Sequence, residues 1–323
     1  MSLLRDLIHR SRLLSKIGAL FNRSFDREIQ SVAAGQSHYW KRVASPTQSS
    51  PLLRRNIHRL EKGLSMPDGK PVFAEDFIEE TVEQYQKCCE SDLCSDERQW
   101  AKDVLIQYFR KVQDTPIIAT ARARFQGGEE GNMVPYARAT VPLSKISYEE
   151  LLVLCQQRRS VRWFKQEPVD VNLIRRAIDL ASLAPSACNR QPFQFFISDK
   201  PDVATDIARL AMGTKGFAEN IPCLIAVVGD LSYYAEYRDR HIIYIDGSLA
   251  TMQLMLALET LGLSSCPINW PDIEKREAKM AKRLKLAAHQ RVVMLVAIGK
   301  ADPSGLIPYS QKKSHQQLMK PIE

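Results

Sequence analysis

A continuous apolar run of strand length constrains the fold of this chain more than any other feature. Residues 223–228 read Cys-Leu-Ile-Ala-Val-Val without a polar interruption. A strand with one face in water alternates apolar and polar residues, whereas a strand covered on both faces is apolar throughout. The run therefore predicts a central strand, with other elements packed on both faces of its sheet.

The segments around this run predict a layered domain. Ser147 and Glu150 have the spacing of a capping box that opens a helix to Gln157, and Asp170 is placed to cap a helix that continues to Leu183. Further helices are expected at 202–212 and 244–261, and further strands at 193–198, 265–268 and 291–299. The helix at 244–261 is apolar nearly all round, so more than one surface must bury it. The alternation predicts an α/β or α+β domain of roughly 175 residues.

The first 145 residues differ in composition and predict a helical, basic extension. Residues 1–65 contain 12 Lys/Arg and 4 Asp/Glu, which accounts for all of the net charge of +8. The expected elements are a basic amphipathic helix at 3–21, a polar linker at 45–51, helices at 54–64, 74–90 and 96–112, and a surface segment at 120–143. A basic segment on a neutral body indicates an accessory role, and docking of residues 1–45 to a membrane surface or a protein partner ranks below packing of their apolar stripe on the rest of the protein.

Composition and missing motifs exclude several classes of protein. No apolar run reaches the roughly 18 residues that cross a bilayer, and the N-terminus lacks the apolar core of a signal peptide. Seven cysteines, an odd number, predict free thiols in a reducing compartment, which favours a cytoplasmic protein. The glycine fingerprints of dinucleotide and phosphate loops, the metal-ligand spacings and the nucleic-acid-binding motifs are all missing.

Four polar segments carry the candidate chemistry. The first, which we name the arginine motif, can grip a phosphate because guanidinium groups bind phosphate oxygens bidentately and a hydroxyl adds a hydrogen bond. The alternative is a solvated basic helix end. In chain order the candidate residues are Arg158, Arg159, Ser160 and Arg162 of the arginine motif, then Ser186, Ala187, Asn189 and Gln191 of a 185–192 loop, then Pro267, Ile268, Asn269 and Trp270, and finally Lys312 and Lys313.

The order and spacing of these segments resemble the FMN-dependent nitroreductase family over residues 146–323. The resemblance implies an α+β, three-layer fold with a central, mostly antiparallel sheet flanked by helices. It also implies a homodimer with FMN at its interface, which passes hydride in ping-pong fashion from NADH or NADPH to an organic acceptor such as a nitroaromatic or a quinone. Flavin itself performs this chemistry, so no catalytic side chain is expected. The extension at 1–145 resembles that of nitroreductase-like proteins linked to polysaccharide biosynthesis.

The resemblance also implies a role for each segment. The arginine motif would hold the phosphate, ribityl chain and pyrimidine edge of FMN. The 185–192 loop would reach the flavin of the dimer partner, and the 267–270 segment would lie along the isoalloxazine ring. Lys312, with Lys313 beside it, stands where the family usually has an arginine on the phosphate, a change that keeps the charge but loses the bidentate fork.

Two alternatives stay open at this point. Arg238 and His241 lie between a core strand and the buried helix, where they could contact a substrate or belong to a solvated loop. The whole chain could also be a flavin-domain scaffold whose extension docks to a membrane surface or to a glycan-biosynthesis partner. A reductive dehalogenase ranks below a general reductase, because the connection after Pro192 leaves little room for a substrate lid.

Overall fold

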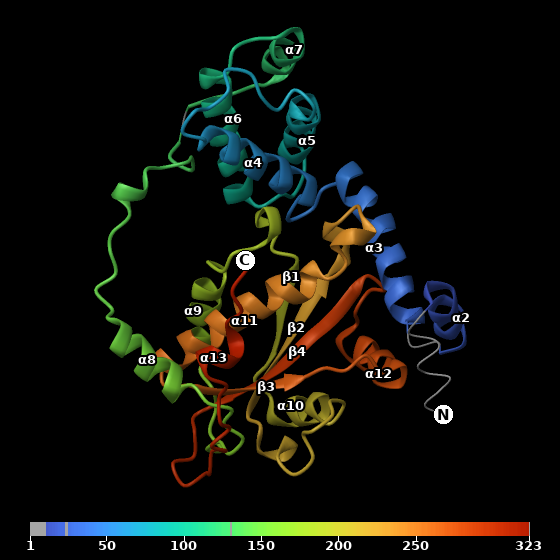
Figure 1. Ribbon diagram of the computed structural model, residues 1–323, viewed down its shortest axis with the longest axis vertical. Helices are drawn as coiled ribbons and strands as arrows, with labels where there is room; N and C mark the ends of the chain where they lie inside the picture. The colour runs from blue at the N-terminus through green and yellow to red at the C-terminus, as the bar shows by residue number, and fades with distance from the viewer. Residues whose placement is uncertain (1–10, 23–24, 130, 323) are drawn as a thin grey trace.

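A computed structural model describes residues 11–22, 25–129 and 131–322 of the chain. An α+β domain forms its lower part, and helices from the N-terminal residues stand above and beside this domain (Figure 1). The sheet has four antiparallel strands in the order β1-β2-β4-β3. Its strands are β1 (Phe193–Ser198), β2 (Cys223–Asp230), β3 (Ser264–Asn269) and β4 (Gln290–Gly299). The predicted fold class and all four predicted strands are confirmed.

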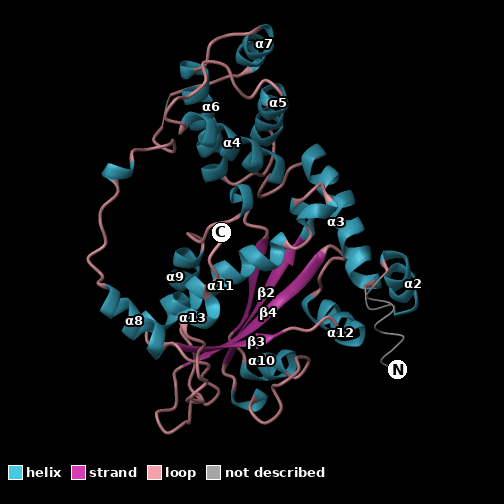
Figure 2. Cartoon of the chain, in the orientation of Figure 1, coloured by secondary structure: helices cyan, strands magenta, loops and turns pink. Residues whose placement is uncertain are grey.

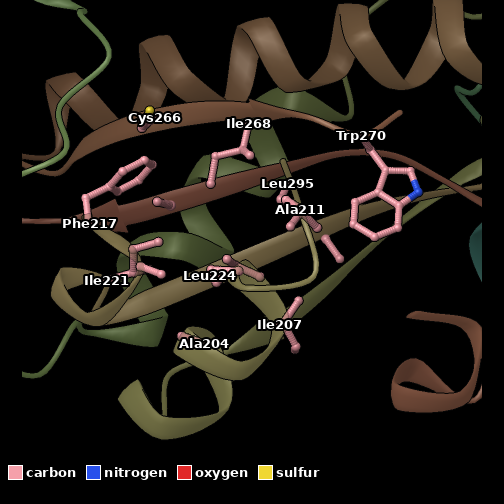
Figure 3. Packing of buried hydrophobic residues seen from close by; sticks show 14 of the residues in the cluster. Ala204, Ile207, Ala211, Phe217, Ile221, Leu224, Cys266, Ile268, Trp270 and Leu295 are labelled. Carbon is pink, nitrogen blue, oxygen red and sulfur yellow. The ribbon is translucent and has the colours of Figure 1, made fainter. Parts of the chain in front are cut away.

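Helices cover both faces of the sheet, as the apolar run predicts. Every residue of β2 is buried, and its side chains alternate between two clusters. Ile225 and Val227 pack with residues of α9 (Val171–Ala181) and α11 (Ile242–Thr260). Leu224 and Ala226 pack on the opposite face with residues of α10 (Pro201–Ala208) and α12 (Glu274–Leu284). The result is a helix–sheet–helix arrangement (Figures 2 and 3).

Helix α11 is the central helix of this domain. By length and composition alone the segment Tyr237–Thr260 could cross a membrane, which the sequence analysis did not expect. Half of it is buried within the protein, however, where it contacts α9 and the strands of the sheet. Three large apolar side chains on its outer face remain substantially exposed: Ile245, Leu249 and Met252. We therefore treat α11 as a core helix with one uncovered apolar face.

Residues 51–125 fold as a helical bundle with a hydrophobic core of its own. The bundle consists of α4 (Pro51–Leu64), α5 (Ile78–Cys89), α6 (Ser95–Lys111) and α7 (Pro116–Arg124). Its core joins residues such as Leu53, Ile57, Leu105 and Tyr108, all from within residues 53–125. The predicted helices at 54–64, 74–90 and 96–112 are confirmed, with α5 beginning four residues late; α7 was not predicted.

Two helices precede this bundle, and the second of them connects it to the α+β domain. They are α2 (Arg12–Asn22) and α3 (Asp26–Ala44), and α3 lies against the segment that follows β2. The predicted helix at 3–21 falls partly outside the described residues. Two apolar side chains of its described part are largely uncovered, since Leu13 is 66% exposed and Ile17 is 42% exposed.

The segments between helices are more ordered than a flexible linker. Ser49 and Ser50 after α3 donate hydrogen bonds of 2.8 Å each to the Glu97 carboxylate, so residues 45–51 form a fixed corner. The capping box of α8 (Tyr148–Gln157) is present as predicted. The helices α9 and α10 end at Ala181 and Ala208, earlier than predicted. The remaining elements are η1 (Arg138–Thr140), η2 (Ala187–Asn189), η3 (Ala218–Asn220), η4 (Leu231–Tyr233), η5 (Tyr237–Asp239) and α13 (His315–Leu318).

Candidate functional site

The arginine motif lies beside the beginning of β3. Ser160 pairs with Ser265 in a parallel β-bridge, and the backbone N–H of Val161 donates to the Ser265 carbonyl at 3.1 Å. The capping box fixes where α8 begins, and the helix ends at Gln157, so the chain enters this pairing directly afterwards. The motif is thereby held as an extended segment along the edge of the sheet.

Buried polar atoms without partners gather around this motif. Among the described residues, Arg158 Nε and Ser265 Oγ are buried and have no hydrogen-bond partner. Glu259, near the end of α11, lies close to Arg158 and accepts from Gln157 Nε2 at 3.2 Å. Burial raises the pKa of the Glu259 carboxyl, and the hydrogen bond from Gln157 opposes the rise. Unpaired buried donors cost free energy, so the site is suited to an acceptor from outside the chain.

The second arginine of the motif binds the C-terminal segment. Arg159 Nη2 donates to the carbonyls of Pro308 at 2.8 Å and Tyr309 at 2.6 Å. Lys312 and Lys313 follow a few residues later, and both are exposed. The structure therefore anchors the segment that carries the predicted C-terminal cations to the arginine motif. Arg162 Nη1 donates to the Ser160 carbonyl at 3.3 Å, and its guanidinium lies 5.7 Å from the centroid of the Phe217 ring.

The 267–270 segment ends β3 and borders a cleft. The cleft has a volume of about 520 Å³ and is lined by this segment together with Tyr244 and Ser248 of α11, Asp272, and Val292, Val293 and Met294 of β4. Ile268 and Trp270 are 5% and 7% exposed, and both belong to the core on the α10 face (Figure 3). Because strand residues alternate, Pro267 and Asn269 face the α11 side. The side chains of Ile268 and Trp270 thus pack in the core beneath the cleft.

A buried ionic cluster that the sequence analysis missed supports the end of β3. Trp270 Nε1 donates to Glu277 Oε1, and Arg291 Nε lies 3.2 Å from Glu277 Oε2. Arg291 also pairs with Asp272 at the cleft. Burial raises the pKa of the neighbouring Tyr244 phenol to about 12, an effect that the charge of Arg291 opposes. No sequence motif indicates that Glu277 and Arg291 belong together, because the residues of this cluster come from separate elements of the chain.

The 185–192 loop is attached to α11 near its N-terminal end. Ser186 Oγ donates to Asp246 Oδ2 at 2.6 Å, and the Ala187 N–H donates to the same oxygen at 3.0 Å. Ser186 Oγ in turn accepts from the Gln191 N–H at 2.8 Å. Burial raises the pKa of the Asp246 carboxyl, and the hydrogen bond from Ser186 opposes the rise. The polar residues predicted for this loop therefore do lie together.

Within one chain, the loop and the arginine motif are far apart. The loop is bonded to Asp246, whereas the arginine motif lies beside Glu259 at the other end of α11. At 1.5 Å per residue, these two carboxylates are separated by about 20 Å along the helix axis. The structure thus brings the arginine motif, the C-terminal segment and the cleft-lining strand together, and it leaves the 185–192 loop apart from them.

Comparison with known proteins finds similarities over the α+β domain. Residues 155–214 and 208–300 match the Nitroreductase family model. Over these residues the chain is similar to the Nitroreductase family. Iodotyrosine deiodinase 1 from Homo sapiens is 24% identical over 202 residues, which cover 53% of this chain and 68% of the relative. Putative NAD(P)H nitroreductase YdgI from Bacillus subtilis is 27% identical over 201 residues, covering 51% of this chain and 94% of the relative.

Solved structures of similar proteins align to the same part of the chain. A nitroreductase-like protein from Streptococcus mutans aligns with a TM-score of 0.48 and 19% identity, covering 55% of this chain and 100% of the other. An FMN-dependent nitroreductase from Clostridium difficile aligns with a TM-score of 0.46 and 20% identity, covering 53% and 99%.

Members of the Nitroreductase family generally use flavin and NAD(P)H, and the residues present fit such a group. The unpaired buried atoms Arg158 Nε and Ser265 Oγ suit a phosphate or a sugar hydroxyl. From Ser265 the strand β3 runs to Asn269 at the cleft, a distance of about 13 Å at 3.3 Å per residue. This arrangement suits an elongated molecule that is anionic at one end and flat at the other.

The two substrate candidates lie elsewhere. Arg238 is exposed in η5, and His241 is exposed immediately before α11. Neither lines the cleft of about 520 Å³. A substrate role for Arg238 and His241 therefore stays a prediction.

Proposed function

We propose that this protein is an FMN-dependent oxidoreductase that reduces an organic acceptor with electrons from NADH or NADPH, and that it acts as a homodimer. The observation that carries the proposal is the set of unpaired donors at Arg158 and Ser265, which lies at one end of β3 while a cleft lies at the other. Arg158, Arg159 and Ser160 would bind the phosphate end, together with Lys312.

FMN, when bound, would supply the hydride chemistry. The residues of the chain then have binding and positioning roles. Pro267 and Asn269 would contact the flat ring, and Asn269 would offer its amide as a neutral hydrogen-bonding group. The buried cluster of Trp270, Glu277 and Arg291 would hold the end of β3 in place and keep this side of the cleft free of water.

The proposal of a homodimer is based on exposed apolar side chains of two neighbouring helices. Ile245, Leu249 and Met252 are exposed on α11, and Leu151 and Val153 are exposed on the neighbouring α8. Exposed apolar patches of this kind mark interfaces. In the proposed dimer, the 185–192 loop of one copy would complete the arginine motif of the other, since the two segments lie apart within one chain.

The test is flavin binding by the purified protein. We expect an absorbance band at roughly 450 nm that NADH or NADPH bleaches without oxygen. Arg158→Met should weaken FMN binding, and Arg209→Met, which removes an exposed ion pair with Glu219, should not. Nitroaromatic, quinone and iodotyrosine acceptors should then be compared, the last because similar proteins are named iodotyrosine deiodinase. A colourless protein that cannot be reconstituted with FMN would contradict the proposal.

A second proposed function, docking to an anionic membrane surface, is favoured by the outer face of α2 and α3. Ile17 of α2 and Ile29 and Trp40 of α3 are exposed, and Lys16 and Lys41 are exposed beside them. Apolar side chains next to cations, with a tryptophan, suit the boundary of an anionic bilayer.

The docking proposal is tested by vesicle flotation. The double variant Ile29→Gln, Trp40→Gln should float less with anionic vesicles than the wild type, while zwitterionic vesicles should retain little of either. Substitution is preferable to removal of residues 1–45, because α3 packs on the α+β domain. Equal flotation of the variant and the wild type would reject the proposal.

A further inference from the structure

Arg54 of the helical bundle contacts the backbone of the 185–192 loop. Arg54 Nε donates to the Asn189 carbonyl at 2.7 Å, across 135 positions of sequence. The same guanidinium pairs with Glu97 of α6 at 2.9 Å, and it lies 5.3 Å from the centroid of the Trp100 ring. The Arg54 and Glu97 side chains are 15% and 4% exposed. Two residues of the bundle, Glu97 and Trp100, therefore orient this guanidinium toward the loop.

The loop needs such support because its backbone is strained. Cys188, Asn189 and Gln191 have φ angles of 53°, 50° and 50°, in the left-handed region that side chains other than glycine rarely adopt. Strained backbone persists where the surroundings hold it in place. The hydrogen bond from Arg54 falls on the central residue of these three.

Contacts within the α+β domain hold other parts of the loop. Asp246 of α11 accepts from Ser186 and from the Ala187 N–H. Arg190 is 8% exposed, and its guanidinium lies 4.7 Å from the centroid of the Tyr234 ring. Asn189 is thus the part of the loop whose backbone is held from the bundle, while its neighbours are held from within the α+β domain.

We propose that Arg54 is a positioning residue that holds the 185–192 loop in the conformation that binds the flavin. The N-terminal bundle is then a structural part of the cofactor site. The second half of this inference rests on the proposed function, since the loop would meet the flavin of a partner subunit. The first half, control of the loop by the bundle, does not require flavin.

The matched variants are Arg54→Met and Arg59→Met. Arg59 lies on the same helix, but its partner Asp76 belongs to the bundle itself. Peptide-resolved hydrogen exchange of residues 184–193 should be about tenfold faster in Arg54→Met, because a charge-assisted hydrogen bond to a strained segment is lost. Arg59→Met should leave exchange in this peptide unchanged. Equal exchange in Arg54→Met and the wild type would overturn the proposal.

FMN binding is measured separately on the same proteins. We expect the dissociation constant of FMN to rise by about tenfold in Arg54→Met and to stay unchanged in Arg59→Met. Faster exchange of the loop with unaltered FMN affinity would overturn the positioning role. A wild-type protein that binds no FMN would instead reject the proposed function, while the exchange data would still decide whether Arg54 controls the loop.

Discussion

A hydrogen bond between Ser186 and Asp246 joins the 185–192 loop to the central helix of the α+β domain. Ser186 Oγ donates to Asp246 Oδ2 at 2.6 Å and accepts from the Gln191 N–H at 2.8 Å. One hydroxyl thus closes the loop on itself and attaches it to α11. Because Asp246 is 3% exposed, water cannot readily replace this donor.

Replacement of this hydroxyl should destabilise the protein. Ser186→Ala leaves a buried carboxylate with one donor fewer and the Gln191 N–H without its acceptor. We expect the free energy of unfolding to fall by about 1.5–3 kcal/mol. The control is Ser182→Ala, which removes an exposed hydroxyl that caps the end of α9. Urea denaturation of both variants provides the measurement, and equal midpoints would contradict the role given to Ser186.

The cluster beneath the cleft gives a second prediction. Glu277→Gln keeps the volume of the side chain but removes the charge that faces Arg291 and weakens the acceptor of Trp270. Arg291 keeps its contact with Asp272, so we expect a loss of about 1–3 kcal/mol. In Glu219→Gln, the matched change at an exposed pair with Arg209, the loss should stay below about 1 kcal/mol. A similar loss in both variants would show that burial of Glu277 has little effect.

The contact between α3 and the α+β domain depends on Gly35, which has no side chain. A Cβ atom at Gly35 would lie 2.7 Å from Leu231 Cβ and 2.8 Å from its carbonyl oxygen. Gly35→Ala should therefore destabilise the protein by about 1–3 kcal/mol, although alanine favours helix. Gly128→Ala is the control, because a Cβ there would meet nothing within 4 Å. Thermal unfolding distinguishes the two, and a more stable Gly35→Ala protein would refute close packing of α3.

The sequence predicted those elements whose signals are local. The capping box at Ser147 and the continuous apolar run of β2 each depend on neighbouring residues, and both predictions are confirmed. Helix α3 was missed because it buries Ser31, Val32, Gly35 and Tyr39, which do not form an apolar stripe. Helix α12 was also missed, because its buried residues, Glu277 and Met280, do not form an apolar stripe either.

The candidate site was predictable only in part. The arginine motif and the 267–270 segment could be found from residue types, and the structure places them at the two ends of β3. The contact between Arg54 and Asn189 could not, because it joins elements that are distant in sequence through a backbone carbonyl. The separation of the arginine motif and the 185–192 loop at opposite ends of α11 likewise depends on tertiary packing.

We expect a buried histidine to make the packing of α3 on the α+β domain sensitive to pH. His289 is 6% exposed, its Nε2 lies 3.6 Å from Asp230 Oδ1, and its ring centroid lies 4.2 Å from that of His38 on α3. Burial lowers the pKa of the His289 imidazole; Asp230 opposes this effect, while His38, Arg42 and Lys41 add to it. Arg42 of α3 also donates to the second oxygen of Asp230 at 3.0 Å.

The sign of the pH dependence follows from this lowered pKa. Below about pH 6.5 the unfolded chain takes up a proton that the folded site resists, so the free energy of unfolding should fall as the pH decreases from there toward the folded pKa. Above about pH 6.5 the imidazole is neutral in both states, and this contribution to stability is fully present. Denaturation of the wild type and of His289→Gln from pH 5 to pH 8 provides the measurement, since glutamine cannot titrate. The wild type should lose more stability than His289→Gln on acidification, and parallel curves would show that His289 is not the group responsible.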